Sequence, residues 1–181
     1  MKKSIILIAL VIAFSAVNAQ KGKVTTAQTL KDSGKLDKAL EAIVQASDAS
    51  NADAEKSVSW PKTWQVRGEI FQAIGQSKDE NFKKLSNDPF GEAFSSYKKA
   101  MELDPKHAID KSIKMNLVLL TNDFTNQAVQ AFQNEDYNKA LESFERIMEI
   151  NNMPVIKADN PNSVDTVIIF NSALAAYNAE K

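Results

Sequence analysis

Apolar residues recur at steps of three and four along most of the chain, the spacing that places them on one face of an α-helix. Three of these stretches resemble one another: residues 36–47, 90–103 and 137–150. Strand-like alternation of apolar and polar residues is absent over any useful length. The pattern therefore predicts an all-α fold in which one type of helix is repeated.

The three similar helices share a pair of positions. In each, an alanine is followed four residues later by a large apolar side chain: Ala39 and Ile43, Ala93 and Tyr97, Ala140 and Phe144. The helix before each of them carries a small residue: Ala27, Gly68 and Ala128. A small residue allows the two helices of a hairpin to cross closely, and the large residues fill the space between hairpins. Because neither helix buries its apolar face alone, the hairpins are expected to stack.

The spacing between these positions is interrupted once. The small residue precedes the aligned alanine by 12 residues in the first and third hairpins, but by 25 in the second. The additional residues, 76–88, are polar and charged. They are interpreted as an insertion between two helices of one hairpin.

The second hairpin carries a motif that resembles the signature of tetratricopeptide repeats. The motif is Trp64-x-x-Arg67-Gly68-x-x-Phe71, followed by Ala93-x-x-x-Tyr97 and Pro105. It departs from the family pattern at Arg67, where the family usually has leucine. Residues 34–39 and 135–140 resemble the turn between the two helices of such a repeat. The resemblance implies an α-solenoid of helix-turn-helix units over residues 20–181. The expected units cover about residues 23–50, 61–105 and 107–151, with an incomplete unit at 163–181.

The first nineteen residues have the pattern of a secretory signal peptide. A basic start is followed by an apolar run over residues 5–14 and by the small-residue sequence Val17-Asn18-Ala19. This pattern predicts export, with cleavage after Ala19 and a periplasmic or extracellular location. The alternative is an uncleaved leader that anchors the chain, and this leader is the only membrane contact that we expect.

Charge and composition narrow the classes of partner and chemistry. The net charge is −1, and it becomes −3 once Lys2 and Lys3 are removed with the leader. No basic patch is present, which argues against a nucleic-acid partner. The chain has no cysteine, one histidine (His107, expected at a helix start) and no glycine-rich phosphate loop. We therefore expect no enzyme activity, no catalytic residue, no metal and no cofactor.

The resemblance also implies where a partner binds, because the first helices of such repeats line a concave groove. Counting from the small residue of each unit places these side chains there: Asn126, Val129, Phe132, Asn171, Leu174 and Tyr177. The same counting places Val66, Glu69 and Gln72 in the groove of the second unit. An asparagine amide both donates and accepts hydrogen bonds, which suits the backbone of an extended peptide. The alternative is that Phe132 and Tyr177 belong to the core and the asparagines are merely solvated.

Two functions are consistent with these features. The first is an exported, non-enzymatic scaffold that binds a protein or peptide through the groove. The second is an oligomerisation or assembly module of a larger envelope protein or complex. The predicted helix over residues 164–180 is strongly apolar, and only one of its sides can pack on the third unit. We therefore expect that the chain continues beyond Lys181 with a further helix, or that two copies form a homo-oligomer through this face.

Overall fold

A computed structural model describes residues 21–51 and 54–180 of the chain. These residues form helices joined by turns and contain no strand, so the all-α prediction is confirmed. They divide between two compact units, residues 1–109 (unit 1) and 110–181 (unit 2). The predicted leader, residues 1–19, lies outside the described residues. None of the helices in the described part is both long enough and apolar enough to cross a lipid bilayer.

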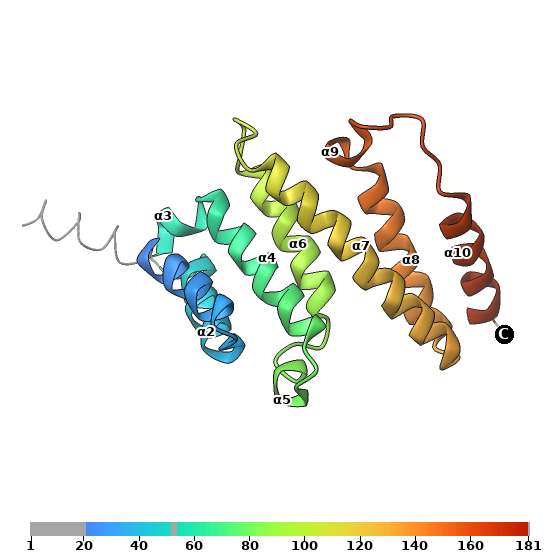
Figure 1. The fold of residues 1–181 in the computed structure, drawn as a ribbon, viewed down its shortest axis with the longest axis horizontal. Helices are drawn as coiled ribbons and strands as arrows, with labels where there is room; N and C mark the ends of the chain where they lie inside the picture. The colour runs from blue at the N-terminus through green and yellow to red at the C-terminus, as the bar shows by residue number, and fades with distance from the viewer. Residues whose placement is uncertain (1–20, 52–53, 181) are drawn as a thin grey trace, which may run out of the picture. The chain divides into compact units, whose positions relative to one another are not determined.

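The described part of unit 1 starts with helical residues 21–32. Five helices follow these residues: α2 (Leu36–Ser47), α3 (Glu55–Val58), α4 (Pro61–Gln76), α5 (Glu80–Lys83) and α6 (Pro89–Glu102). Helix α4 contacts both α2 and α6 (Figure 1). Two of the predicted repeated stretches, residues 36–47 and 90–103, are therefore helices in the structure and pack against a common neighbour.

The close crossing predicted at Gly68 is present between α4 and α6. A Cβ atom added to Gly68 would lie 2.6 Å from Cδ1 of Tyr97, which is too short for two carbon atoms. The Tyr97 ring is completely buried, and its hydroxyl donates a hydrogen bond of 2.8 Å to Oε1 of Gln72. The glycine is therefore required because the tyrosine ring occupies the space where any other side chain would begin.

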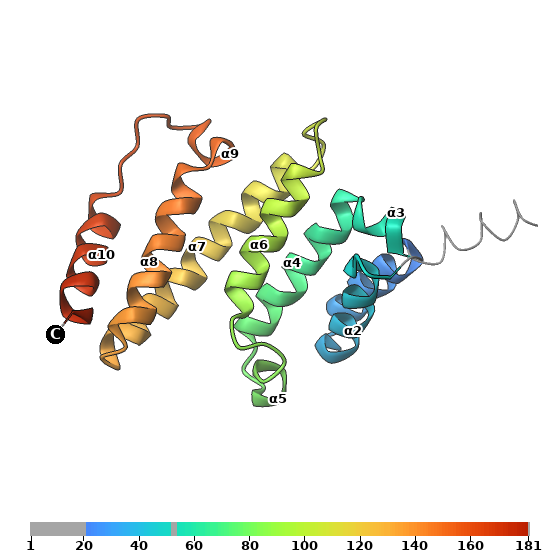
Figure 2. The same cartoon turned by 180° about the vertical axis from the view of Figure 1, so that it is seen from behind.

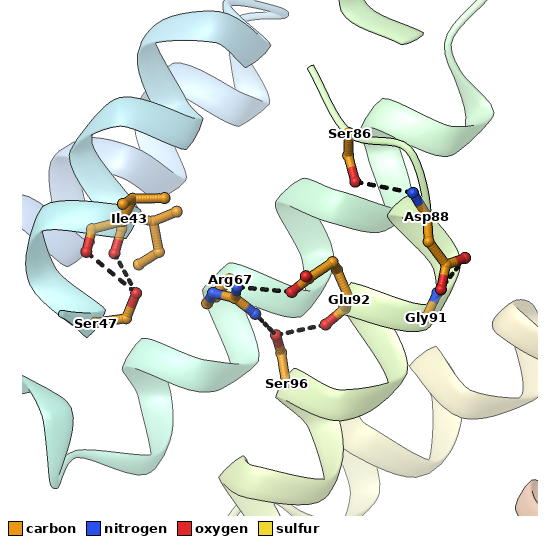
Figure 3. Close-up of polar contacts among 9 residues, drawn as sticks. Ile43, Ser47, Arg67, Ser86, Asp88, Gly91, Glu92 and Ser96 are labelled. Carbon is orange, nitrogen blue, oxygen red and sulfur yellow. Dashed lines mark hydrogen bonds and ion pairs between the residues drawn. The ribbon is translucent and has the colours of Figure 1, made fainter. Parts of the chain in front are cut away.

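Arg67, the departure from the repeat signature, joins the same two helices. Its guanidinium donates to Oε2 of Glu92 at 2.7 Å and to Oγ of Ser96 at 2.6 Å (Figure 3). The guanidinium carbon also lies 4.6 Å from the centroid of the Phe71 ring. Charge-assisted hydrogen bonds are about twice as strong as neutral ones. Arg67 thus joins α4 and α6 by polar contacts.

Residues 77–88 connect α4 to α6 and contain the short helix α5, which contacts α4. Gly75 lies inside α4, where an added Cβ atom would be 2.8 Å from Cδ1 of Phe90. At the end of the connection, Oδ1 of Asp88 accepts a hydrogen bond of 3.4 Å from the Gly91 amide, and Pro89 is the first residue of α6. Aspartate followed by proline is a typical helix start.

The predicted similarity of residues 34–39 and 135–140 extends to their backbone. Gly34 has a φ angle of 73° and Glu135 has one of 61°. The residue after each donates its amide to a carbonyl five residues earlier, from Lys35 to Leu30 and from Asp136 to Ala131, both at 2.9 Å. This left-handed residue ends a helix in the usual way. One turn type therefore closes a helical hairpin in each unit.

Unit 2 consists of α7 (Asp110–Gln133), α8 (Tyr137–Asn152), α9 (Pro154–Lys157) and α10 (Thr166–Ala179). Helix α8 contacts the other three (Figures 1 and 2). The buried core is formed by side chains of α7 and α8: Ile113, Leu117, Leu120, Phe124, Ala128, Ala140, Phe144, Ile147 and Ile150. Helix α10 covers another side of α8 with Ile168, Ser172 and Ala175.

Candidate partner-binding surface

Unit 2 has a hollow of about 190 Å³ at the place where α7, α8 and α10 meet. It is lined by Val129, Phe132 and Gln133 of α7, Phe144 of α8, and Asn171 and Leu174 of α10. Four of these six side chains are apolar, two carry amides and none is charged. Such a surface can bury apolar side chains and exchange hydrogen bonds with a peptide backbone.

Local structure holds the walls of the hollow in place. Phe144 is 3% exposed and forms part of the packed core between α7 and α8. The Phe132 ring meets the Tyr137 ring edge to face, with centroids 5.2 Å apart, across the turn that joins the two helices. Oδ1 of Asp136 caps α8 by accepting a hydrogen bond of 3.1 Å from the Lys139 amide. The α7 and α8 sides are therefore formed by a closed hairpin.

The third wall depends on how α10 begins. Oδ1 of Asp165 accepts a hydrogen bond of 3.0 Å from the Ile168 amide, which fixes the first turn of the helix. Asn171 and Leu174 are three residues apart and therefore share one side of α10. The Asn171 side chain makes no hydrogen bond to another group in the described part of the chain. Its amide is available to a ligand.

An exposed stripe of α7 leads to the hollow. Its members follow one another at steps of three and four, so they share one side of the helix: Met115, Val118, Leu119, Asn122, Asn126 and Val129. Met115 is 61% exposed, and Val118 and Leu119 are each 50% exposed. The stripe reaches Gln133 at the end of the helix and is about 27 Å long at 1.5 Å per residue. The stripe begins with three apolar side chains, continues with two asparagines, and ends with Val129 and Gln133, without a charged group.

The structure separates the six predicted site residues into two groups. Val129, Phe132, Asn171 and Leu174 line the hollow together. Asn126 is exposed on the stripe, one turn before Val129, and does not line the hollow. Tyr177 is 61% exposed on α10, outside the hollow, so the alternative that placed it in the core is wrong.

Sequence reasoning missed two lining residues. Gln133 lies four residues after Val129, and continuing the stripe by one turn would have found it. Phe144 was assigned only to packing between hairpins, yet it lines the hollow while being almost completely buried. A side chain at the base of a hollow can belong to the core and to the surface at once.

The residues of unit 1 that were assigned to a groove are buried or already hydrogen-bonded, unlike those that line the hollow. Val66 is completely buried and Gln72 is 6% exposed. The Glu69 carboxylate accepts hydrogen bonds from Lys31 at 2.7 Å and from Gln65 at 2.8 Å. Burial lowers the pKa of Lys31, but the hydrogen bond and the charge of Glu69 outweigh it, so this pKa is raised. These side chains are engaged in holding the unit together.

No group of three or more histidine, cysteine, aspartate or glutamate side chains within residues 21–51 and 54–180 could hold a metal ion. His107 lies exposed in the turn before α7 with a φ angle of 57°, whereas a helix start was expected at this position.

Comparisons with known proteins leave this geometry as the main guide to function. No family model matches the chain, and no curated protein or solved structure shows significant similarity to it.

Proposed function

We propose that this protein is an exported, non-enzymatic scaffold that binds a peptide segment of a protein partner. In this proposal the helical hairpins form a solenoid of the tetratricopeptide type, and the leader directs the chain to the periplasm or out of the cell. The hollow of unit 2 and the exposed stripe of α7 bind the peptide. The observation that carries the proposal is the uncharged, largely apolar hollow with a free asparagine amide.

The chemistry of the surface defines the peptide. Val129, Leu174 and the aromatic rings would bury one apolar side chain, since the hollow holds about 190 Å³. Asn171 would exchange hydrogen bonds with the peptide backbone beside that side chain. Further apolar side chains would lie on Leu119 and Met115 along the stripe. An extended segment of about eight residues spans 27 Å, at 3.3 Å per residue.

The test is selection of peptides on the chain without its leader. Random 12-residue peptides are displayed on phage, enriched on the immobilised protein, and measured individually by fluorescence anisotropy. We expect enriched peptides with two or three apolar residues. Asn171→Ala and Asn126→Ala should each weaken binding about fivefold, because each removes a hydrogen bond worth about 1 kcal/mol.

Asn138→Ala is the matched control, because Asn138 is an exposed asparagine of α8 that does not line the hollow. It should bind the enriched peptides as the wild type does. If no peptide is enriched over an unrelated helical protein, or if the Asn126→Ala, Asn171→Ala double variant binds with unchanged affinity, the proposal is wrong.

A further inference from the structure

The hollow of unit 2 lies beside an acidic turn. Gln133, which lines the hollow, is the last residue of α7, and the turn to α8 then carries Glu135 and Asp136 (Figure 1). Both of these side chains are exposed. Two residues along the chain cover at most about 7 Å, so the Glu135 backbone stays close to Gln133. Two carboxylates therefore border one end of the uncharged hollow.

The negative charge of this turn is not balanced by the part of the chain that the structure describes. There, neither Glu135 nor Asp136 forms an ion pair, and the last turn of α7 carries no basic residue. Lys139, in the first turn of α8, pairs with Glu142 at 3.0 Å. The carbonyl end of α7 adds a partial negative charge at the same place. A positive charge brought by a ligand would therefore be attracted here.

Aromatic rings lie between the acids and the hollow. Phe132 lines the hollow, and its ring meets that of Tyr137 across the turn. Both rings are half-buried, so each keeps an exposed surface. The carbon stem of a lysine or arginine packs on such a surface while its charged end stays in water, and the ring face attracts the cation. The rim thus combines the two kinds of group that bind an ammonium or a guanidinium.

We infer that the peptide bound at the hollow carries a lysine or arginine directly beside the apolar side chain that the hollow buries. This inference rests on the proposed function and defines its ligand more closely. Neighbouring residues of an extended peptide are about 3.5 Å apart, and a lysine or arginine side chain reaches on the order of 6 Å further. A basic neighbour can therefore reach the carboxylates of Glu135 and Asp136, whereas an acidic neighbour is repelled by them.

The phage-displayed random peptides test this inference on the chain without its leader. Enriched peptides should show lysine or arginine beside an apolar residue more often than the starting library does. The most enriched peptide is then synthesised with lysine, glutamine or glutamate at that position and measured by fluorescence anisotropy. In about 20 mM salt the lysine form should bind about threefold more tightly than the glutamine form and at least about tenfold more tightly than the glutamate form. In about 500 mM salt these differences should fall below about twofold.

Glu135→Lys tests whether the turn itself makes this selection. The variant should bind the glutamate form of the peptide more tightly than the lysine form. Both residues carry a Cβ atom, so the strain of the φ angle of 61° is unchanged. Glu145→Lys is the matched control, because Glu145 is an exposed acid of α8 that does not line the hollow. It changes the net charge by the same amount and should keep the preference for the lysine form.

Asp136→Asn keeps the test informative if Glu135→Lys disturbs folding. Asparagine caps a helix about as well as aspartate, so α8 should form normally while one negative charge is lost. The advantage of the lysine form over the glutamate form should shrink about twofold to threefold. An unchanged advantage in both Asp136→Asn and Glu135→Lys, or an equal loss in Glu135→Lys and Glu145→Lys, overturns the inference.

The same measurements separate this inference from the proposed function. Enriched apolar peptides that show no excess of basic neighbours, or equal binding of the three synthetic forms, overturn the inference and leave peptide binding intact. A selection that enriches no peptide overturns the proposed function, and the inference with it.

Discussion

The two units use their side chains in different ways. Unit 1 joins its helices by polar contacts: Arg67 to Glu92 and Ser96, Tyr97 to Gln72, and Lys31 to Glu69. In the described part of unit 1, Val44 is the large apolar side chain that remains notably exposed. Unit 2 has large exposed apolar side chains on both α7 and α10.

The net charge also differs between the two units. Residues 20–109 carry fourteen basic and thirteen acidic residues, a net charge of +1. Residues 110–181 carry six basic and ten acidic residues, a net charge of −4. The net negative charge of unit 2 opposes non-specific association through its exposed apolar side chains. In the described residues, large apolar side chains are therefore exposed mainly on unit 2.

The largest expected effect is in unit 1, at the crossing of α4 and α6. Gly68→Leu should destabilise the protein by about 3 kcal/mol, because the new side chain begins inside the space of the buried Tyr97 ring. Urea unfolding measured by circular dichroism gives the change. Gly22→Ala is the control, since nothing lies within 4 Å of an added Cβ there. That variant should be neutral or more stable by up to about 1 kcal/mol, because alanine favours a helix. Equal stability of the two variants would contradict the crossing.

The second prediction concerns the packing of α10 in unit 2. Ala175 is completely buried, whereas Ala173 is exposed two residues earlier. Ala175→Leu should cost about 2 kcal/mol, because the larger side chain separates α10 from α8. Ala173→Leu should stay within about 0.5 kcal/mol of the wild type. Hydrogen exchange of the α10 amides should become faster in the first variant alone. Faster exchange in both would show that α10 is not docked on the side described.

The smallest expected effect concerns the turn that closes a helical hairpin in each unit, at Gly34 in unit 1 and at Glu135 in unit 2. Glu135→Gly should stabilise the protein by about 1 kcal/mol, because a residue with a side chain at a φ angle of 61° is strained. Gly34→Ala should destabilise it by a similar amount, although nothing lies within 4 Å of the added Cβ. Thermal unfolding of each variant measures its change in stability. If both changes shift the melting temperature in the same direction, the two turns do not share a conformation.

The sequence predicted the repeated helices well, because their bounds depend on local signals. Residues 36–47 are α2 without any shift, and residues 90–103 and 137–150 lie within two residues of α6 and α8. Gly68 and Tyr97 were identified because a small residue and a large one recur at fixed positions. The likeness to tetratricopeptide repeats, the leader and the solenoid remain predictions.

The candidate site was less predictable, because it depends on how one helix is rotated against another. Leu174 and Tyr177 are three residues apart and were assigned to the same groove. In the structure Leu174 lines the hollow, whereas Tyr177 is 61% exposed and lies outside it. In unit 1, Val66 was assigned to a groove by counting, but it is buried in the packing of α4. The spacing along a helix determines which residues share one side of that helix. How the helix packs on its neighbours determines whether that side is buried or exposed.

The first turns of α10 also have a consequence for the handling of the protein. The sequence Thr166-Val167-Ile168-Ile169-Phe170 is β-branched and aromatic, without charge or proline. Segments of this composition form amyloid-type strands when they leave their native helix. Asp165, which caps the helix, is the charge next to this segment, and a flanking charge opposes such stacking. Shelf life in concentrated solution should therefore follow the local opening of this one helix, rather than the global unfolding of the chain.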